Sequence, residues 1–539
     1  MVNTADFHET DMMILVAMLW FLYCLVVLLI FWTVRFGMGA LRRYLYSTPL
    51  CGPNSRENST DCATLAARYG AVFQVPTGTF THNIVLCDPA AIAHFYANAP
   101  GIYRTPEHLR RTTKTLVGRG LAWAEGERHR SHRQALAPLF TQASIEQNFV
   151  PVFFEMAQKM HSSWRQDLRT RPRGMIVDIK HWMSCVVLDS LGIAGFAHDF
   201  ESLKGDYCIV TAAFHALRAP KTSSLSNTIF HFASSYAPSP LFSLPTAKNR
   251  VIQDFRGLMS RLAGDVLERS TIKDGLPDTS FLGLLIKSLA ENPAGEFRLS
   301  HEEVLAQIVS SPGFGVETNI DNARILCCFL ALALPQHLSV FWTLVELARN
   351  PTCQDTLRTE LRQAGALSSY CKISKLPYLH AVVYETLRLH PPVEDTTRVA
   401  SADDVIPLSA PISSKLGETV SSIKIAKSCT LTVPIRYANS SEAFWGPGAL
   451  KFDPGRWWQW QDKSTADFPG NRHLAFGDGA RGCIGADFAF ALIKVVLAVT
   501  VAGFEISLSG GPETVIEPVQ GCVPFPGISS EMLVVVRKL

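Results

Sequence analysis

Near the C-terminus one cysteine stands among glycines, close behind a basic residue. Cys483 lies between Gly482 and Gly485, and Arg481 precedes it by two positions. Glycines let the backbone turn sharply and let a flat ligand approach closely. A helix is predicted from Phe488 to Thr500, directly after this loop. The positive end of that helix and the nearby arginine both favour a negatively charged sulphur. The spacing therefore predicts a thiolate held in a tight loop.

The wider loop carries a family resemblance. The pattern Phe476-x-x-Gly479-x-Arg481-x-Cys483-x-Gly485 resembles the haem-binding loop of the cytochrome P-450 superfamily, with every fixed position filled. The resemblance implies that these five residues bind haem b and that Cys483 is the axial ligand of its iron, where a thiolate favours O–O cleavage. The alternative for a single cysteine is a small buried hydrophobe, and we expect that for the other twelve.

Two further stretches resemble family positions that contact the haem propionates. His129 and Arg133 are four residues apart, so they share one face of a predicted helix. The family usually has tryptophan at the first of these positions, and histidine can still donate a hydrogen bond there. Arg398, after a Pro-Pro turn, matches a third propionate position. The alternative for the basic run around Arg133 is a solvated helix face.

The family also carries an oxygen-activating helix above the haem. Here Gly315-Val316-Glu317-Thr318 stands in its register. The resemblance implies that Thr318 holds the water chain that protonates iron-bound oxygen and that Glu317 relays the proton. Pro312 and the apolar run Asn322–Pro335 depart from the pattern. That departure is interpreted either as a local bulge or as translated intron, because the run is too short for a second membrane span.

Three charged residues are expected to be structural. Glu385 and Arg388 share a helix face, and Arg456 lies in a Pro-Gly-Arg-Trp stretch that resembles the family's meander. The resemblance implies a buried cluster that braces the cysteine loop. By itself, such a pair is more often a surface ion pair that contributes under ~1 kcal/mol.

The N-terminus predicts a membrane anchor. Met12–Val34 is uncharged and about one bilayer thick, and Arg35, Arg42 and Arg43 follow it, which places the remaining chain in the cytosol. A signal peptide is disfavoured because the apolar core is too long and no cleavage site follows. We expect a single-pass protein of the endoplasmic reticulum membrane. Its segments are a lumenal N-terminus (1–11), the transmembrane helix (12–34), a basic, proline-rich hinge (35–53) and the catalytic domain (54–539).

Composition limits the alternatives. The chain has 539 residues, and a net charge of +3 is too small to suggest a nucleic-acid partner. Thirteen cysteines without a Cys-x-x-Cys pair argue against a disulfide framework or a zinc site and suit a reducing compartment. Four basic residues are interpreted either as a docking face for an acidic electron donor or as plain surface; they are Arg128, Arg130, Arg472 and Lys494.

Strands are predicted over 68–75, 84–89 and 428–434, and amphipathic helices over much of 150–295. The family resemblance covers Pro49–Leu539. It implies a mainly α fold with small β-sheets (α+β), the cytochrome P-450 fold, with haem buried between the oxygen-activating helix and the cysteine loop.

The implied function is a membrane-anchored monooxygenase that hydroxylates or epoxidises a lipophilic small molecule such as a terpenoid, sterol or fatty acid. Electrons would come from NADPH through NADPH-cytochrome P-450 reductase, and the resemblance also allows cytochrome b5 as a donor. The residues of the motifs are most similar to those of fungal members, many of which act in secondary metabolism. The inference to secondary metabolism is by analogy.

Two alternatives remain open. One is a haem-thiolate isomerase or dehydratase that acts on a peroxide and needs no reductase. Glu317 and Thr318 argue against it, since such enzymes tend to lack that pair. The other is a non-catalytic protein, with or without haem, if the run after Thr318 disrupts the distal helix.

Overall fold

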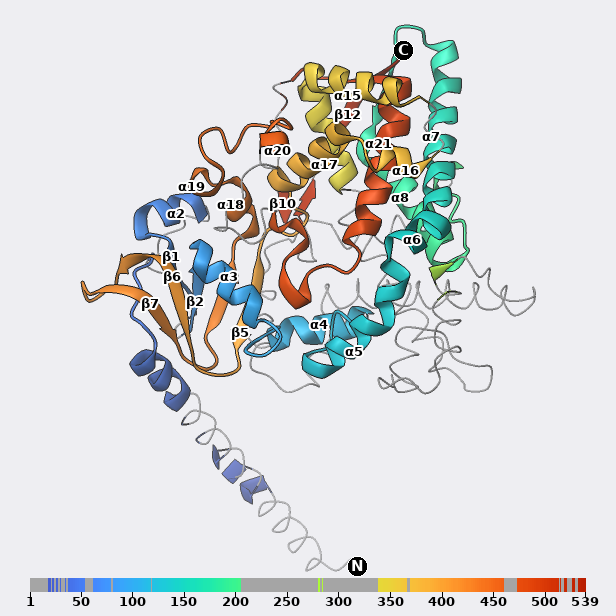
Figure 1. Cartoon of the computed structure of the whole chain (residues 1–539). Coiled ribbons are helices and arrows are strands. Elements are labelled where there is room, and N and C mark those ends of the chain that lie inside the picture. The colour runs from blue at the N-terminus through green and yellow to red at the C-terminus, as the bar shows by residue number, and fades with distance from the viewer. Residues whose placement is uncertain are drawn as a thin grey trace, which may run out of the picture. The chain divides into compact units, whose positions relative to one another are not determined.

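The computed structural model forms two compact units (Figure 1). Unit 1 comprises residues 1–95, 102–104 and 397–432, and unit 2 comprises 96–101, 105–396 and 433–539. The expected catalytic domain, 54–539, is thus divided between them. The residues that the structure describes are 37–53, 62–78, 81–117, 119–204, 338–365, 369–459, 473–512 and 532–539, with short pieces at 18–20, 22–23, 26–27, 30, 34, 280–281, 284, 514, 518–520 and 526–528.

Unit 1 is built on a five-stranded sheet of order β1-β2-β8-β5-β3. Its first two strands are antiparallel, with Val72 opposite Leu86, and β2 runs parallel to β8. A separate hairpin joins β6 to β7. The elements are α2 (Cys62–Tyr69), β1 (Val72–Gly78), β2 (Thr81–Leu86), α3 (Pro89–Asn98), β3 (Tyr103–Arg104), β5 (Thr396–Ala400), β6 (Asp404–Ser413), β7 (Thr419–Ile425) and β8 (Thr430–Val433).

The strand predicted from residue 68 begins later than expected. Arg68 and Tyr69 end α2, and β1 starts only at Val72. Gly70 between them has φ +94°, a left-handed conformation that glycine adopts at little cost and that ends a helix. The alternation of polar and apolar residues that predicted a strand from Arg68 therefore covers the end of α2 and the start of β1.

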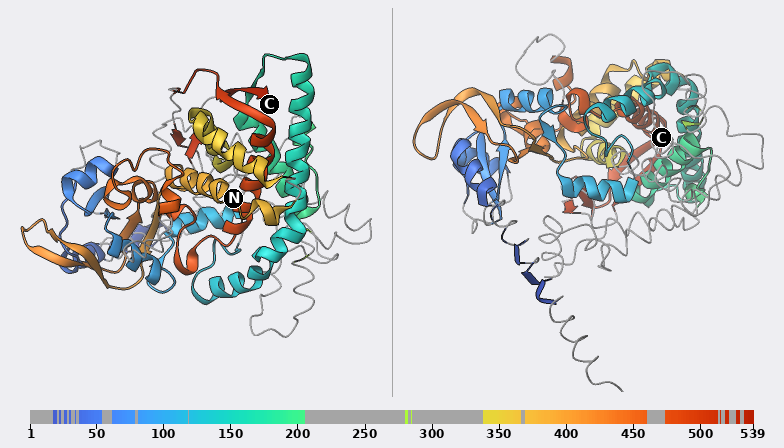
Figure 2. Two further views of the ribbon diagram at one scale, coloured as in Figure 1. Left: turned by 45° about the horizontal axis from the view of Figure 1, so that its top comes forward. Right: turned by 90° about the horizontal axis from the view of Figure 1, so that it is seen from below.

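Unit 2 is mostly helical, and Figure 2 shows its long helices from two further sides. Its sheets are β4-β12-β9 and β10-β11. The helices before the undescribed middle of the chain are α4 (Glu107–Val117), α5 (Gly126–Leu136), η1 (Ala137–Phe140), α6 (Gln142–Ser144), η2 (Ile145–Phe149), α7 (Val150–Thr170), α8 (Ile179–Phe196) and η3 (Ser202–Lys204). Residues 338–349 are also helical.

The remaining elements of unit 2 carry the cysteine loop and its supports. The helices are α15 (Pro351–Ala364), α16 (Tyr370–Ile373), α17 (Pro377–Leu389), α18 (Ile435–Ser440), α19 (Glu442–Trp445), α20 (Arg456–Gln459), η6 (Leu474–Phe476), η7 (Gly479–Arg481) and α21 (Ala486–Gly503). The strands are β4 (Met175–Asp178), β9 (Phe504–Leu508), β10 (Pro518–Gln520), β11 (Pro526–Ile528) and β12 (Leu533–Lys538).

Helix α21, which follows the cysteine, is the centre of this core. It is apolar around most of its circumference and packs against α7, α15, α16 and α17. Phe488 in its first turn is 3% exposed, and its ring lies 5.3 Å from that of Phe149 and 5.0 Å from that of Phe153. The position of the loop before α21 is therefore fixed by a helix that is itself buried.

Among the described residues, one helix could cross a membrane by its length and composition. The one helix there that is long and apolar enough is Ala486–Gly503, and it is mostly buried within the protein, as a core helix would be. Most of the expected anchor, 12–34, lies outside the described residues. Its described residues are helical, and their apolar side chains, such as Trp20 and Ile30, are exposed.

Truncation of Phe488 tests the role of α21. We expect Phe488→Ala to lower the free energy of unfolding by about 3–5 kcal/mol, because it leaves a cavity beside the rings of Phe149 and Phe153. Urea denaturation of the purified protein would measure the loss. Leu450→Ala, at a side chain that is 76% exposed, is the control and should change stability little. Equal effects from both variants would contradict this assignment of the core.

Candidate functional site

The cysteine loop is closed by backbone and side-chain hydrogen bonds. It runs from η6 through Gly477 and η7 to Cys483. The N–H of Cys483 donates to the carbonyl of Phe476 at 2.8 Å, which closes the loop into a ring. Asp478 caps η7 by accepting the N–H of Gly479 at 2.7 Å. These bonds hold the cysteine at a defined place before α21.

One glycine of the loop is required by its geometry. Gly479 has φ +65°, and a Cβ at this position would lie 2.8 Å from the carbonyl oxygen of Tyr96. Both facts exclude a larger residue without movement of the backbone. The glycine therefore lets the loop pass directly against the chain at Tyr96.

Opposing effects act on the thiol of Cys483. Surrounding protein desolvates it and raises its pKa, while the N–H of Gly485, which donates to the sulphur, and the cation of Arg133 act in the opposite direction. As a residue, Cys483 is nevertheless exposed. Because the residue is exposed, a ligand can reach the sulphur. Because the surrounding protein desolvates the sulphur, a negative charge on it is costly. A metal ion on the sulphur would favour the thiolate further.

Helix α5 contacts the loop through Arg133. Its Nη1 donates to the carbonyl of Gly482 at 2.5 Å, so the guanidinium lies next to the cysteine. His129 is one turn earlier on the same helix and is half-buried. The structure thus brings Arg133 to the loop, and the spacing places His129 on the same helix face.

A second contact with the loop was not predicted from the sequence. The carboxylate of Glu125, just before α5, pairs with Nη2 of Arg481, and the side chains are 13% and 8% exposed. The same Nη2 also donates to the carbonyl of Ala124 at 2.9 Å. The other oxygen of Glu125 accepts the N–H of Thr105 at 3.1 Å. Helix α5 is therefore joined to the loop near both of its ends.

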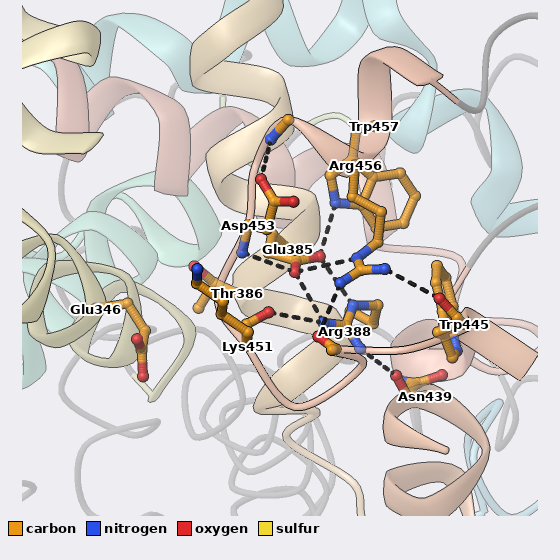
Figure 3. A network of polar contacts seen from close by, with 12 residues as sticks. Glu346, Glu385, Thr386, Arg388, Asn439, Trp445, Lys451, Asp453, Arg456 and Trp457 are labelled. Carbon is orange, nitrogen blue, oxygen red and sulfur yellow. Dashed lines mark hydrogen bonds and ion pairs between the residues drawn. The ribbon is translucent and has the colours of Figure 1, made fainter. Parts of the chain in front are cut away.

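Glu385 and Arg388 form a fully buried ion pair on α17 (Figure 3). Both side chains are 0% exposed. Arg388 donates from Nε and from Nη2 to the two carboxylate oxygens, each at 2.8 Å, and from Nη1 to the carbonyl of Asn439 at 2.7 Å. Its guanidinium also lies over the ring of Trp445.

The meander supplies the remaining partners of Glu385. Nε of Arg456 donates to it at 3.4 Å, the indole of Trp457 at 3.0 Å and the N–H of Asp453 at 3.0 Å. Figure 3 shows these groups converging on one carboxylate. The three charged residues expected to cluster therefore do lie together.

Asn439 connects this cluster to the cysteine loop. Its carbonyl accepts from Arg388, and its side-chain Oδ1 accepts the N–H of Leu474 at 2.8 Å. Leu474 opens η6, whose last residue, Phe476, closes the loop onto Cys483. Hydrogen bonds at Asn439 and Phe476, joined by the backbone of η6, thus link the buried ion pair to the cysteine.

The prediction of a basic surface face is wrong for one of its four residues, Lys494. Lys494 is only 5% exposed, since it lies on a buried face of α21, and its Nζ is 3.0 Å from Nδ1 of His380. Burial lowers the pKa of Lys494 to about 8 and that of His380 to about 4. Arg128 and Arg130 are exposed on α5, and Arg472 lies outside the described residues.

The remaining predicted site residues are Glu317, Thr318, Arg398 and Phe476. Glu317 and Thr318, with the run 312–335, lie outside the described residues. Arg398 lies on β5 and is described with unit 1. Phe476, in η6, is half-buried and packs 5.2 Å from the ring of Phe490.

The described residues fit a flat cofactor ligated by sulphur. An accessible thiol lies in a glycine-rich loop, a backbone N–H is directed at the sulphur, and Arg133 stands beside it. No group of three or more His, Cys, Asp or Glu side chains that could hold a metal ion occurs in the part of the chain that the structure describes. A cofactor with its own metal, such as haem, needs only the one protein ligand.

Comparison with known proteins supports the same family over most of the chain. The sequence profile of the family Cytochrome P450 matches residues 48–333 and 337–523. The break between the two matched segments falls at the end of the apolar run 322–335.

Similar proteins include cytochrome P450 monooxygenase claO of Ampulloclitocybe clavipes, 38% identical over 94% of this chain and 95% of the relative. Monooxygenase claP of that fungus is 36% identical over the same shares. Cytochrome P450 monooxygenase 205 of Postia placenta is 31% identical over 88% and 86%.

Neutralising Glu385 tests the buried ion pair. We expect Glu385→Gln to lower the free energy of unfolding by about 3–5 kcal/mol, because Arg388 would keep its charge in the core without a partner. Chemical denaturation would measure this. Glu394→Gln breaks an exposed pair with Arg436 and should cost under about 1 kcal/mol. A loss no larger than that of the control would contradict the assigned role.

Removal of the charge at Arg133 tests its effect on the cysteine. Arg133→Gln keeps a donor for Gly482 but removes the cation, so the pKa of Cys483 should rise and less thiolate should form at a given pH. In the haem-loaded protein, the thiolate-ligated form should then appear at higher pH, as followed by reduced carbon-monoxide spectra across a pH series. Arg130→Gln, exposed on the same helix, is the control. An unchanged pH midpoint would show that Arg133 does not act on the sulphur.

Proposed function

Because this chain belongs to the cytochrome P450 family, whose activity is monooxygenation, we propose that Cys483 is the thiolate ligand of haem b. The observation that carries the proposal is the environment of that sulphur. It is accessible, it accepts the N–H of Gly485, and Arg133 stands beside it in a loop closed at Phe476. Haem held there would supply the activation of O₂.

The other residues of the site receive positioning roles. Arg133, His129 and Arg398 are assigned to the propionates, and Arg481 joins them from the loop. Phe476, Gly479 and Gly485 shape the loop around the ligand. The cluster of Glu385, Arg388 and Arg456 supports it from α17 through Asn439, so its contribution is to stability rather than to the reaction.

On the distal side, Thr318 and Glu317 are assigned to proton delivery. Thr318 would hold a water through its hydroxyl, and Glu317 would exchange protons with that water, which is the task of a general acid in this chemistry. The run 322–335 follows them, and its two interpretations, local bulge and translated intron, predict different transcripts. Sequencing the messenger RNA across this region distinguishes them.

The substrate is proposed to be a lipophilic small molecule, terpenoid, sterol or fatty-acid-like, oxidised by hydroxylation or epoxidation in fungal secondary metabolism. The monooxygenases to which the chain is similar come from fungi. Electrons are proposed to come from NADPH-cytochrome P-450 reductase, with cytochrome b5 as a second donor. A single-pass anchor in the endoplasmic reticulum membrane is supported by exposed apolar side chains on the described helical residues between 18 and 34.

The reduced carbon-monoxide spectrum of the full-length protein tests the ligand. We expect the red-shifted Soret band of a haem thiolate, and we expect Cys483→Ala to lose it because no sulphur remains in the loop. Cys371→Ala, at another exposed cysteine, should keep the band. A histidine-type spectrum in the unmodified protein would contradict the proposal. If the band is present, NADPH consumption with reductase and a lipophilic substrate would distinguish a monooxygenase from an isomerase, which would consume none.

A further inference from the structure

Two cysteines of unit 1 lie in contact although 25 positions separate them. Cys62 is the first residue of α2, and Cys87 directly follows β2. Their sulphur atoms are 3.7 Å apart. All of the described cysteines are free thiols. Neither residue of this pair belongs to the cysteine loop or to its supports, so the proposed monooxygenase reaction does not use them.

The surrounding backbone holds both residues in place. The N–H of Cys87 donates to the carbonyl of Ala71 at 2.8 Å, next to the β1–β2 pair in which Val72 lies opposite Leu86. On the other side, Leu65 of α2 is buried. Helix α2 contacts β1, so the two sulphurs lie on elements that pack against each other.

The two thiols differ in access. Cys62 is half-buried, whereas Cys87 is only 4% exposed. The hydrogen bond with Cys62 and burial both raise the pKa of Cys87. An oxidant arriving from solvent therefore meets Cys62 first, and Cys87 is shielded behind it. A reactive thiol with a second thiol poised beside it is the arrangement typical of redox-sensitive sites.

We propose that Cys62 and Cys87 are a redox-active pair that hydrogen peroxide converts into a reversible disulfide. The Cys62 thiolate attacks one peroxide oxygen, the O–O bond breaks, and hydroxide leaves to take up a proton as water. The Cys62 sulfenic acid is then attacked by Cys87; the S–S bond forms, the S–O bond breaks and a second water leaves. Overall, two thiols are oxidised, and one peroxide is reduced to two waters.

The geometry suits this step. A disulfide has its sulphurs about 2.05 Å apart, so formation of the bond requires these atoms to approach by about 1.7 Å. In a reducing compartment the pair would rest as dithiol and form the bond only under oxidative load. The bond would tie the start of α2 to the end of β2 within unit 1.

Peptide mapping of the haem-loaded, full-length protein tests the proposal. After peroxide treatment, blocking of free thiols and tryptic digestion, we expect peptide 57–68 joined to peptide 69–104. Its mass should be about 2 Da below the sum of the free peptides, since two hydrogens are lost. Treatment with a thiol reductant before blocking should remove the species.

Matched variants separate the pair from the other thiols. Cys62→Ala should abolish the linked peptide and leave Cys87 reduced, because Cys87 is shielded from solvent. Cys87→Ala should leave Cys62 as a sulfenic acid that dimedone traps. Cys51→Ala, at another half-buried cysteine of unit 1, should keep the linked peptide. Carbon-monoxide spectra of each variant would establish that it is folded.

Two results would overturn the proposal. If peroxide oxidises the exposed Cys371 while Cys62 and Cys87 both remain thiols, then the pair is a packing contact without redox function. Linkage of Cys62 to any other cysteine would also contradict it.

Discussion

Unit 2 depends on one carboxylate that has no access to water. Removing Glu385 and Arg388 from solvent costs several kcal/mol per ion, and their mutual attraction offsets that cost only when every remaining donor and acceptor is satisfied. The partners come from the meander and from α18, which are 51 to 72 positions away in the chain. The buried ion pair therefore specifies how α17, α18 and the meander pack together, because any other arrangement would leave a buried charge without partners.

The cysteine loop is held from two directions. Through Asn439 it is joined to the buried pair, and through Glu125 and Arg133 it is joined to α5. Helix α21 adds a third, apolar constraint from behind. A sulphur ligand has to be held at a fixed position before its cofactor binds, because preorganisation removes the cost of ordering the site at that moment.

Several of these features could be predicted because they depend on local spacing. The i, i+3 pair of Glu385 and Arg388 and the glycine pattern around Cys483 are visible in consecutive residues. The pairing of Glu125 with Arg481 could not be predicted, because the two residues are 356 positions apart and no sequence pattern identifies Glu125 as the partner of Arg481. Lys494 was expected at the surface because of its charge alone, without regard to the apolar residues around it in the sequence. The apolar residues on all sides of it in α21 were the signal that could have placed it inside.

That lysine has a consequence for proton linkage. The pKa of Lys494 is about 8 in the folded protein, below its ordinary value of 10.5, so the folded protein binds this proton less readily than the unfolded chain does. Between these values the unfolded chain holds more protons, so stability rises with pH across that window. His380, whose pKa falls from 6.5 to about 4, has the same sign at lower pH. Asp487 and Glu360 oppose the effect at Lys494 without cancelling it. This amine and this imidazole thus make the folded state more sensitive to acid than to mild alkali.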